Sequence, residues 1–349
     1  MSFDNCPLGI RKTTSKTVPK EPLFLLLYHP CVTLPSINDP KQFPVKIHTL
    51  DLVFLGLEHS IAVFVVETAD GPVLIECGPA STLAHLKAAL LESGWQISDF
   101  QHVFLSHIHF DHAGAAWAFA ENGAKIYVHP KGLPHLAAPE KLYNSARMIY
   151  GEAMDELWGE MRPVAETQLH APEHGAIIVV GGIQFRAWYT PGHASHHIAW
   201  EVSPANLKDN RLDSVVFTGD VAGVKIGEGP VMPPCPPPDI NIEDWLASIH
   251  LLRELPAERL FLTHFGEIQR KHHHLDMLEK RLLSWAAWMK PYFEQETPTE
   301  AIIPIFQAYV QAELLAEGVP IEDLQRYEAA NPAFMSVAGL LRYWKKNTA

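Results

Sequence analysis

One stretch of the sequence decides how this chain is interpreted: Leu105-Ser106-His107-Ile108-His109-Phe110-Asp111-His112-Ala113-Gly114. The apolar segment His102–Leu105 before it is expected to be a buried strand, and the Ala-rich segment Ala113–Asn122 after it a helix. His107 and His109 are two residues apart, so on an extended chain they point the same way. Three imidazoles and a carboxylate within six residues are costly to bury unless a divalent cation compensates them. The stretch therefore predicts a metal site.

Three later segments each place a histidine or an aspartate shortly after an apolar segment that is expected to be a strand. They are Thr190-Pro191-Gly192-His193 after Phe185–Tyr189, Phe217-Thr218-Gly219-Asp220 after Ser214–Phe217, and Leu262-Thr263-His264 at the end of the segment from Arg259. An α/β scaffold can bring loop residues at the ends of its strands to one site. His193, Asp220 and His264 therefore stand at positions from which a scaffold of this kind could bring them together.

These motifs resemble those of the metallo-β-lactamase superfamily, of which HxHxDH is the signature. The resemblance spans roughly residues 45–270. It implies an α/β (α+β) fold, an αββα sandwich of two mixed β-sheets flanked by helices, here with a C-terminal helical extension. Carried over residue by residue, it also implies a binuclear centre: His107, His109 and His193 on one metal, Asp111, His112 and His264 on the other, and Asp220 bridging them.

The resemblance and the ligand types together predict a hydrolase. Nitrogen and carboxylate ligands without thiolates suit two divalent ions, Zn²⁺ first, with iron or manganese possible. Two cations lower the pKa of a bridging water, which gives a hydroxide able to attack a carbonyl or phosphorus near pH 7. Asp111 is the predicted catalytic residue, placed to take up the proton. The complete ligand set favours the glyoxalase II-like branch and hydrolysis of a thioester, ester or lactone.

Other activities remain open from the sequence. The same fold hosts iron-dependent redox enzymes of the persulfide dioxygenase and flavodiiron types. The flavodiiron alternative is disfavoured because the chain after His264 is expected to be helical rather than βαβ. A phosphodiesterase is less favoured because the chain is acidic. A metal-binding but catalytically silent module is disfavoured by the intact ligands.

Several further residues have an open role. Glu76, in Ile75-Glu76-Cys77-Gly78, stands where this family often has an aspartate; it could hydrogen-bond a ligand histidine or be a plain turn residue. His196 and His197 either line the site or simply continue into the next strand. The consecutive His272–His274 splay around a predicted helix, so we expect all three to be solvent-exposed.

Composition limits the choice of partners. The 349 residues contain 27 Lys and Arg against 40 Asp and Glu, a formal charge of −13, which disfavours general nucleic-acid binding. With 47% apolar and 19% charged residues the chain is typical of a globular protein, and no apolar run reaches the roughly 18 residues of a membrane span. Four cysteines without a CxxC motif predict reduced thiols and a cytoplasmic protein. We expect a small-molecule substrate and a possible homodimer.

The chain divides into a loose N-terminal arm (1–20), a metallo-β-lactamase-like domain (21–265) and a helical C-terminal region (266–349). The domain should open with an antiparallel meander over Val45–Gly78, with one strand at Leu50–Leu55. Substrate selection is expected from the mostly helical insertion 131–165, the Pro-rich loop 227–238 or the helical tail. Side chains of that insertion considered for this role are Tyr143, Arg147, Tyr150 and Trp158.

Overall fold

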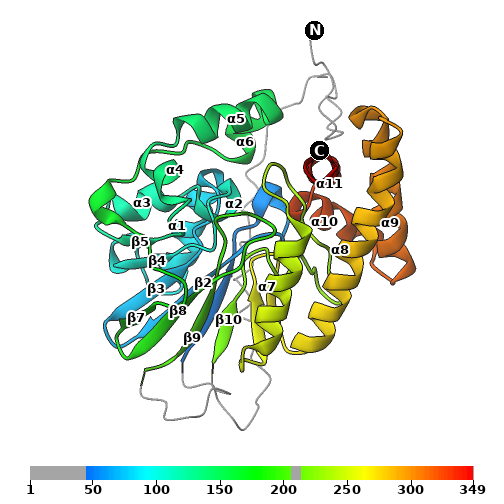
Figure 1. The fold of residues 1–349 in the computed structure, drawn as a ribbon. Coiled ribbons are helices and arrows are strands. Elements are labelled where there is room, and N and C mark those ends of the chain that lie inside the picture. The colour runs from blue at the N-terminus through cyan, green and yellow to red at the C-terminus, as the bar shows by residue number, and fades with distance from the viewer. Residues whose placement is uncertain (1–44, 206–213, 349) are drawn as a thin grey trace, which may run out of the picture.

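Two β-sheets packed face to face form the centre of the protein, with helices on both outer faces (Figure 1). The computed structural model describes residues 45–205 and 214–348. The expected arm 1–20 and the first residues of the expected domain 21–265 lie outside these described residues. Within them, each sheet has six strands and both are mixed, so the expected αββα sandwich is confirmed.

The first sheet has the strand order β1-β2-β3-β4-β5-β6. Its strands are β1 Ile47–Asp51, β2 Ala62–Thr68, β3 Gly71–Ile75, β4 His102–Phe104, β5 Lys125–Tyr127 and β6 Leu169–His170. β1, β2 and β3 form the expected antiparallel meander, and β3 to β6 pair in parallel. The strand expected at Leu50–Leu55 ends early, at Asp51. Val53 and Leu55 have left-handed φ values of 47° and 55°, which turn the chain out of the sheet.

The second sheet has the order β12-β11-β10-β9-β8-β7. Its strands are β7 Ile177–Val180, β8 Ile183–Tyr189, β9 Ile198–Pro204, β10 Val215–Phe217, β11 Arg259–Leu262 and β12 Gly266–Ile268. Gly181 and Gly182 turn β7 into β8 as expected. The chain after His264 is almost entirely helical as expected, except for β12, which the sequence did not predict and which pairs antiparallel with β11. Three residues are too short to show a strand period in the sequence.

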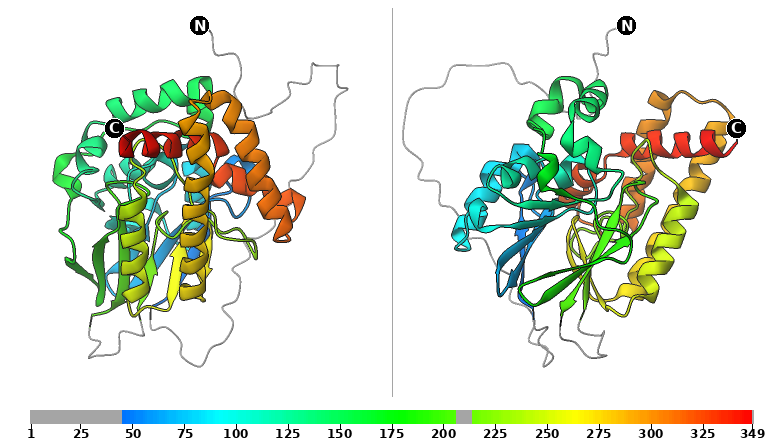
Figure 2. Two further views of the ribbon diagram at one scale, coloured as in Figure 1. Left: turned by 45° about the vertical axis from the view of Figure 1, so that its right-hand side comes forward. Right: turned by 60° about the vertical axis from the view of Figure 1, so that its left-hand side comes forward.

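The helices divide between the two outer faces, as the right-hand view of Figure 2 shows. One set covers the first sheet: α1 Leu83–Glu92, α2 Phe110–Ala113, α3 Ala116–Ala120, α4 Leu133–Ala137, α5 Glu140–Tyr150 and α6 Met154–Leu157. The other set covers the second sheet: α7 Ile242–Glu254, α8 Lys271–Glu294, α9 Thr299–Ala316, α10 Leu324–Ala330 and α11 Ala333–Asn347. The insertion 131–165 is helical and irregular, as its sequence predicts.

Three apolar layers hold these elements together, one between the sheets and one under each set of helices. β2 shows how one strand serves two layers. Phe64 and Val66 point into the layer between the sheets, whereas Val63 and Val65 pack under the first set of helices. Both faces of such a strand are covered, which is why its sequence is apolar throughout rather than alternating.

The C-terminal helices share one apolar layer with the second sheet. Trp285 of α8 and Phe306 of α9 belong to the same buried cluster as Leu260 of β11. Because α8 lies flat on this layer, one face of it is buried, and His274 falls on that face. It is 4% exposed, and its Nε2–H donates to the carbonyl oxygen of Ala222 at 2.7 Å. The expectation that His272–His274 are all exposed is therefore wrong for His274 and correct for the other two.

Among the helices of the described ranges, none combines the length and the apolar character that crossing a lipid bilayer requires.

Candidate metal centre

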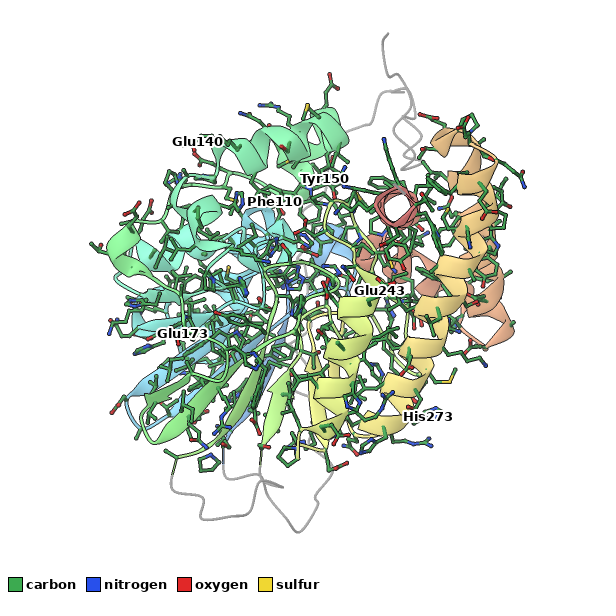
Figure 3. The ribbon with its side chains drawn as sticks, in the orientation of Figure 1. Phe110, Glu140, Tyr150, Glu173, Glu243 and His273 are labelled. Carbon is green, nitrogen blue, oxygen red and sulfur yellow. The ribbon has the colours of Figure 1, made fainter. Side chains whose placement is uncertain are left out.

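The candidate metal centre lies where several strand ends meet at one edge of the two sheets. β4 ends just before the HxHxDH stretch, β8 ends just before His193, β10 before Asp220 and β11 before His264. Figure 3 labels Phe110, which lies within that stretch. The structure brings together all seven residues named from the sequence, in three overlapping groups whose candidate ligand atoms lie within 4.8 Å of one another.

The first group consists of three histidines. The Nε2 of His107 is 2.8 Å from the Nδ1 of His109, and that same Nδ1 is 3.1 Å from the Nε2 of His193. Burial lowers the pKa of all three imidazoles, to about 4 for His109, and repulsion from neighbouring histidines adds to this effect. Three neutral imidazoles that turn ring nitrogens to one point can donate their lone pairs to a cation.

The second group combines a carboxylate with two histidines. The Oδ2 of Asp111 lies 3.4 Å from the Nε2 of His264 and 3.7 Å from the Nε2 of His112. Burial would raise the pKa of Asp111, but the two imidazoles outweigh it and lower that pKa to about 2. Asp111 is thus a carboxylate at neutral pH. Its side chain is 19% exposed, whereas those of His112 and His264 are buried.

Asp220 lies between the two groups. Its Oδ2 is 3.3 Å from the Nε2 of His193, whereas its Oδ1 is 3.2 Å from the Nε2 of His112 and 3.4 Å from the Nε2 of His264. Burial opposes its charge, yet the three imidazoles hold the pKa of Asp220 well below its usual range. Each oxygen of one ionised carboxylate therefore faces a different group of candidate ligands.

Hydrogen bonds on the far side of the rings orient two of these histidines as metal ligands. The Nδ1–H of His193 donates to the carbonyl oxygen of Pro234 at 2.8 Å, and the Nδ1–H of His264 donates to that of Ser60 at 2.7 Å. A carbonyl only accepts, so the proton of each neutral ring sits on Nδ1 and the lone pair of Nε2 points into the centre. This tautomer is the one that ligates metals through Nε2.

Unpaired atoms show that the residues fit a cation. Among the described residues, the Nε2 of His112, the Nε2 of His264 and the Oδ1 of Asp220 are buried without a hydrogen-bond partner. A buried polar atom without a partner costs about 1–3 kcal/mol. The Oδ1 lies within 3.4 Å of both nitrogens, and divalent cations that accept the lone pairs of all three atoms would explain the arrangement. The set contains only nitrogen and oxygen, which suits Zn²⁺, iron or manganese.

Glu76 contacts His112 on the side of its ring that faces away from Asp220. It is buried, its Oε1 lies 3.2 Å from the Nδ1 of His112, and its Oε2 accepts the backbone N–H of Ser106 at 3.2 Å. Burial lowers the pKa of His112, but the carboxylates around it, Glu76 included, raise it well above the usual value. Glu76 therefore lies against a candidate ligand histidine and is no plain turn residue, although its φ of 61° is a turn-like conformation.

His197 and His196, whose roles the sequence left open, differ in what they contact. The Nδ1–H of His197 donates to the Oγ1 of Thr190 at 2.8 Å, so its Nε2 accepts the backbone N–H of Asp220 at 3.2 Å. His197 thereby holds the backbone of the central aspartate in place. His196 packs beside His109, with ring centroids 5.7 Å apart, and its Nε2 is 4.0 Å from the carboxylate of Asp239.

Two glycines let the ligand loops approach closely. Gly192 has φ 138°, and a Cβ there would lie 2.3 Å from the Cα of Trp245. Gly219 has φ 49°, and a Cβ there would lie 2.4 Å from the Oγ of Ser106. Side chains at these positions would be strained. One at Gly192 would force the His193 loop and α7 apart, and one at Gly219 would force the Asp220 loop away from Ser106.

The sequence matches the metallo-β-lactamase superfamily over residues 57–264, which includes all seven candidate ligands. The chain belongs to this superfamily. It is 28% identical over 236 residues to the metallo-β-lactamase fold-containing protein ST1585 of Sulfurisphaera tokodaii, a match that covers 64% of this chain and 84% of the relative.

Solved structures are similar in fold. The crystal structure of ST1585 superposes with a TM-score of 0.52 and 24% identity, covering 66% of this chain and 84% of that one. The metallo-β-lactamase family protein TTHA1429 from Thermus thermophilus superposes with a TM-score of 0.55 and 18% identity, covering 87% of this chain and 94% of that one. The second match thus extends over more of this chain than the first.

Proposed function

We propose that this protein is a binuclear metal-dependent hydrolase of the glyoxalase II-like branch, acting on a small-molecule thioester, ester or lactone. The position of Asp220 carries the proposal. Its Oδ2 lies against His193 of one ligand group, and its Oδ1 lies against His112 and His264 of the other. A carboxylate between two ligand groups is what a pair of metal ions requires as a bridge.

The seven candidate ligands would be shared between two metal ions. His107, His109 and His193 would hold one divalent ion, most simply Zn²⁺, and Asp111, His112 and His264 the other, with Asp220 shared. Such ions supply Lewis acidity and lower the pKa of water, which provides a nucleophile at neutral pH. The carbonyls of Pro234 and Ser60 keep the rings of His193 and His264 turned inward, and the carboxylate of Glu76 lies beside the ring of His112.

Asp111 is the residue proposed to move a proton. It is ionised at neutral pH, since its pKa is lowered to about 2, and its side chain is more exposed than those of His112, His264 and Asp220. A partly exposed carboxylate at the edge of the centre can accept a proton during attack and return it to the leaving group.

The charge of the chain supports an uncharged carbonyl substrate over a phosphodiester, because the net charge of −13 disfavours approach of an anion. The free, buried thiols of Cys77 and Cys235 support the proposal that the protein works in the reducing cytoplasm.

Metal content tests the proposal first. We expect about two zinc ions per chain in the purified wild type, by elemental mass spectrometry, and a marked loss in Asp220→Ala. Asp239→Ala is the matched control, because Asp239 is a nearby aspartate outside the three ligand groups. About one iron per chain would overturn the binuclear zinc proposal and direct assays to oxygen consumption with thiol or persulfide substrates.

Hydrolysis is then assayed on a panel of thioesters, esters and lactones, with a phosphodiester alongside. Turnover of the carbonyl compounds that disappears on chelation and returns with Zn²⁺ supports the proposal. Turnover of the phosphodiester alone would contradict it.

A further inference from the structure

A row of aromatic side chains leads away from the metal centre. Phe110 lies between the candidate ligands His109 and Asp111 in the sequence, and its ring stacks on Trp158 with centroids 6.0 Å apart. Trp158 meets the ring of Tyr150 edge-on at 5.4 Å, and Tyr150 meets that of Phe334 edge-on at 6.1 Å. Figure 3 labels Tyr150 near the end of α5 that lies toward α11, and Phe110 below this helix. We call these four residues the aromatic wall.

The wall is assembled from three separate parts of the chain. Phe110 belongs to the HxHxDH stretch, Tyr150 and Trp158 to the insertion 131–165, and Phe334 to α11 of the C-terminal region. Tyr150, Trp158 and Phe334 are each only half-buried. An apolar surface that remains partly open beside a reactive centre is typical of a ligand site.

The hydroxyl of Tyr150 adds a polar group to the wall. Burial, and then the charge of the Asp111 carboxylate, raise the pKa of Tyr150 above its usual value, so this hydroxyl stays protonated at neutral pH. A hydroxyl donor on an apolar surface suits a carbonyl compound with an apolar substituent.

We propose that the aromatic wall binds the apolar acyl or aryl group next to the carbonyl that the metal centre attacks, and that Tyr150 and Phe334 determine this specificity. The inference rests on the proposed hydrolase function and narrows its substrate class to esters, thioesters or lactones with medium-length alkyl or aromatic substituents. The C-terminal region, through Phe334, then contributes part of the substrate site.

The first test measures selectivity rather than overall rate. With the zinc-loaded protein, kcat/KM is determined for a series of thioesters with acyl chains from two to ten carbons and for a phenylacetyl thioester. We expect kcat/KM to rise about threefold with each added methylene until the wall is covered. Phe334→Ala should flatten this dependence, whereas Tyr292→Ala, which truncates a half-buried ring on α8, should leave it unchanged.

Tyr150→Phe isolates the hydroxyl. We expect it to lower kcat/KM by a similar factor for every member of the series, and to leave the dependence on chain length unchanged because the ring remains. The matched control is Tyr143→Phe, which removes a hydroxyl from the same helix that bonds Asp155 instead. Zinc content is measured for each variant and should equal that of the wild type.

A binding measurement separates failure of this inference from failure of the proposed function. Titration calorimetry compares octanamide with acetamide on the metal-free protein, where no turnover is involved. If octanamide binds more tightly than acetamide and Phe334→Ala abolishes this difference, the aromatic wall is supported even when no thioester is hydrolysed. Absence of thioester hydrolysis would contradict only the hydrolase proposal. Hydrolysis without chain-length dependence, together with equal binding of the two amides, would overturn the wall and leave the hydrolase proposal standing.

Discussion

Substitution of Gly339 tests whether α11 of the C-terminal region holds the loop that orients His193. Gly339 of α11 lies against the Pro-rich loop 227–238, and a Cβ at this position would lie 1.9 Å from the carbonyl oxygen of Cys235. Helix and loop would have to separate by at least about 1 Å before this contact reached the 3.0–3.4 Å range of tight Cβ contacts. The neighbouring residue Pro234 accepts the Nδ1–H of His193. Moving the loop therefore disturbs a candidate ligand.

The expected size of the effect follows from two opposed terms. At an unobstructed helix position Gly→Ala stabilises a protein by up to about 1 kcal/mol. At Gly339 the clash is with backbone atoms, so we expect overpacking to cost about 1–3 kcal/mol and the net free energy of unfolding to fall. Loss of the Pro234 contact should weaken metal binding by about 10–100-fold, as for other residues that orient metal ligands.

Zinc affinity is measured by competition with a chromophoric chelator, and the unfolding free energy by urea titration of the metal-free protein. Ala338→Gly is the control, since it weakens the same helix by about 1 kcal/mol without adding volume. If Gly339→Ala loses stability but binds zinc as tightly as Ala338→Gly does, α11 does not position His193. If Gly339→Ala is more stable than the wild type, α11 is not pressed against the loop at all.

Three further predictions concern single side chains. Glu76→Gln keeps the bond to the Ser106 N–H but removes the charge beside His112, so zinc affinity measured by chelator competition should fall about 10–100-fold. His197→Phe leaves the backbone N–H of Asp220 unpaired and should lower the unfolding free energy of the metal-free protein by about 1–3 kcal/mol; an unchanged urea midpoint would refute this. Burial lowers the pKa of His274 to about 4, so its stabilising contribution is complete above about pH 6.5 and is lost as the pH falls toward 4. Between pH 7 and pH 5, the unfolding free energy of His274→Gln should therefore fall by about 2 kcal/mol less than that of the wild type, as measured by urea titration at both pH values.

The sequence by itself determined the superfamily and the candidate ligands, because both depend on local patterns. The spacing in HxHxDH and the position of His193, Asp220 and His264 directly after apolar strands are readable without any tertiary contact. The fold then brings these residues together, since the ends of neighbouring strands meet at one edge of the sheets.

Only the tertiary structure decided what surrounds those ligands, because the decisive contacts join residues far apart in the chain. The carbonyl that orients His264 belongs to Ser60, and the helix that restrains the loop beside His193 begins at Ala333. Burial of His274 likewise depends on how α8 lies on the second sheet. Such contacts have no local period or motif, so the sequence could name the chemistry of the centre but not the side chains that position it or form the proposed wall beside it.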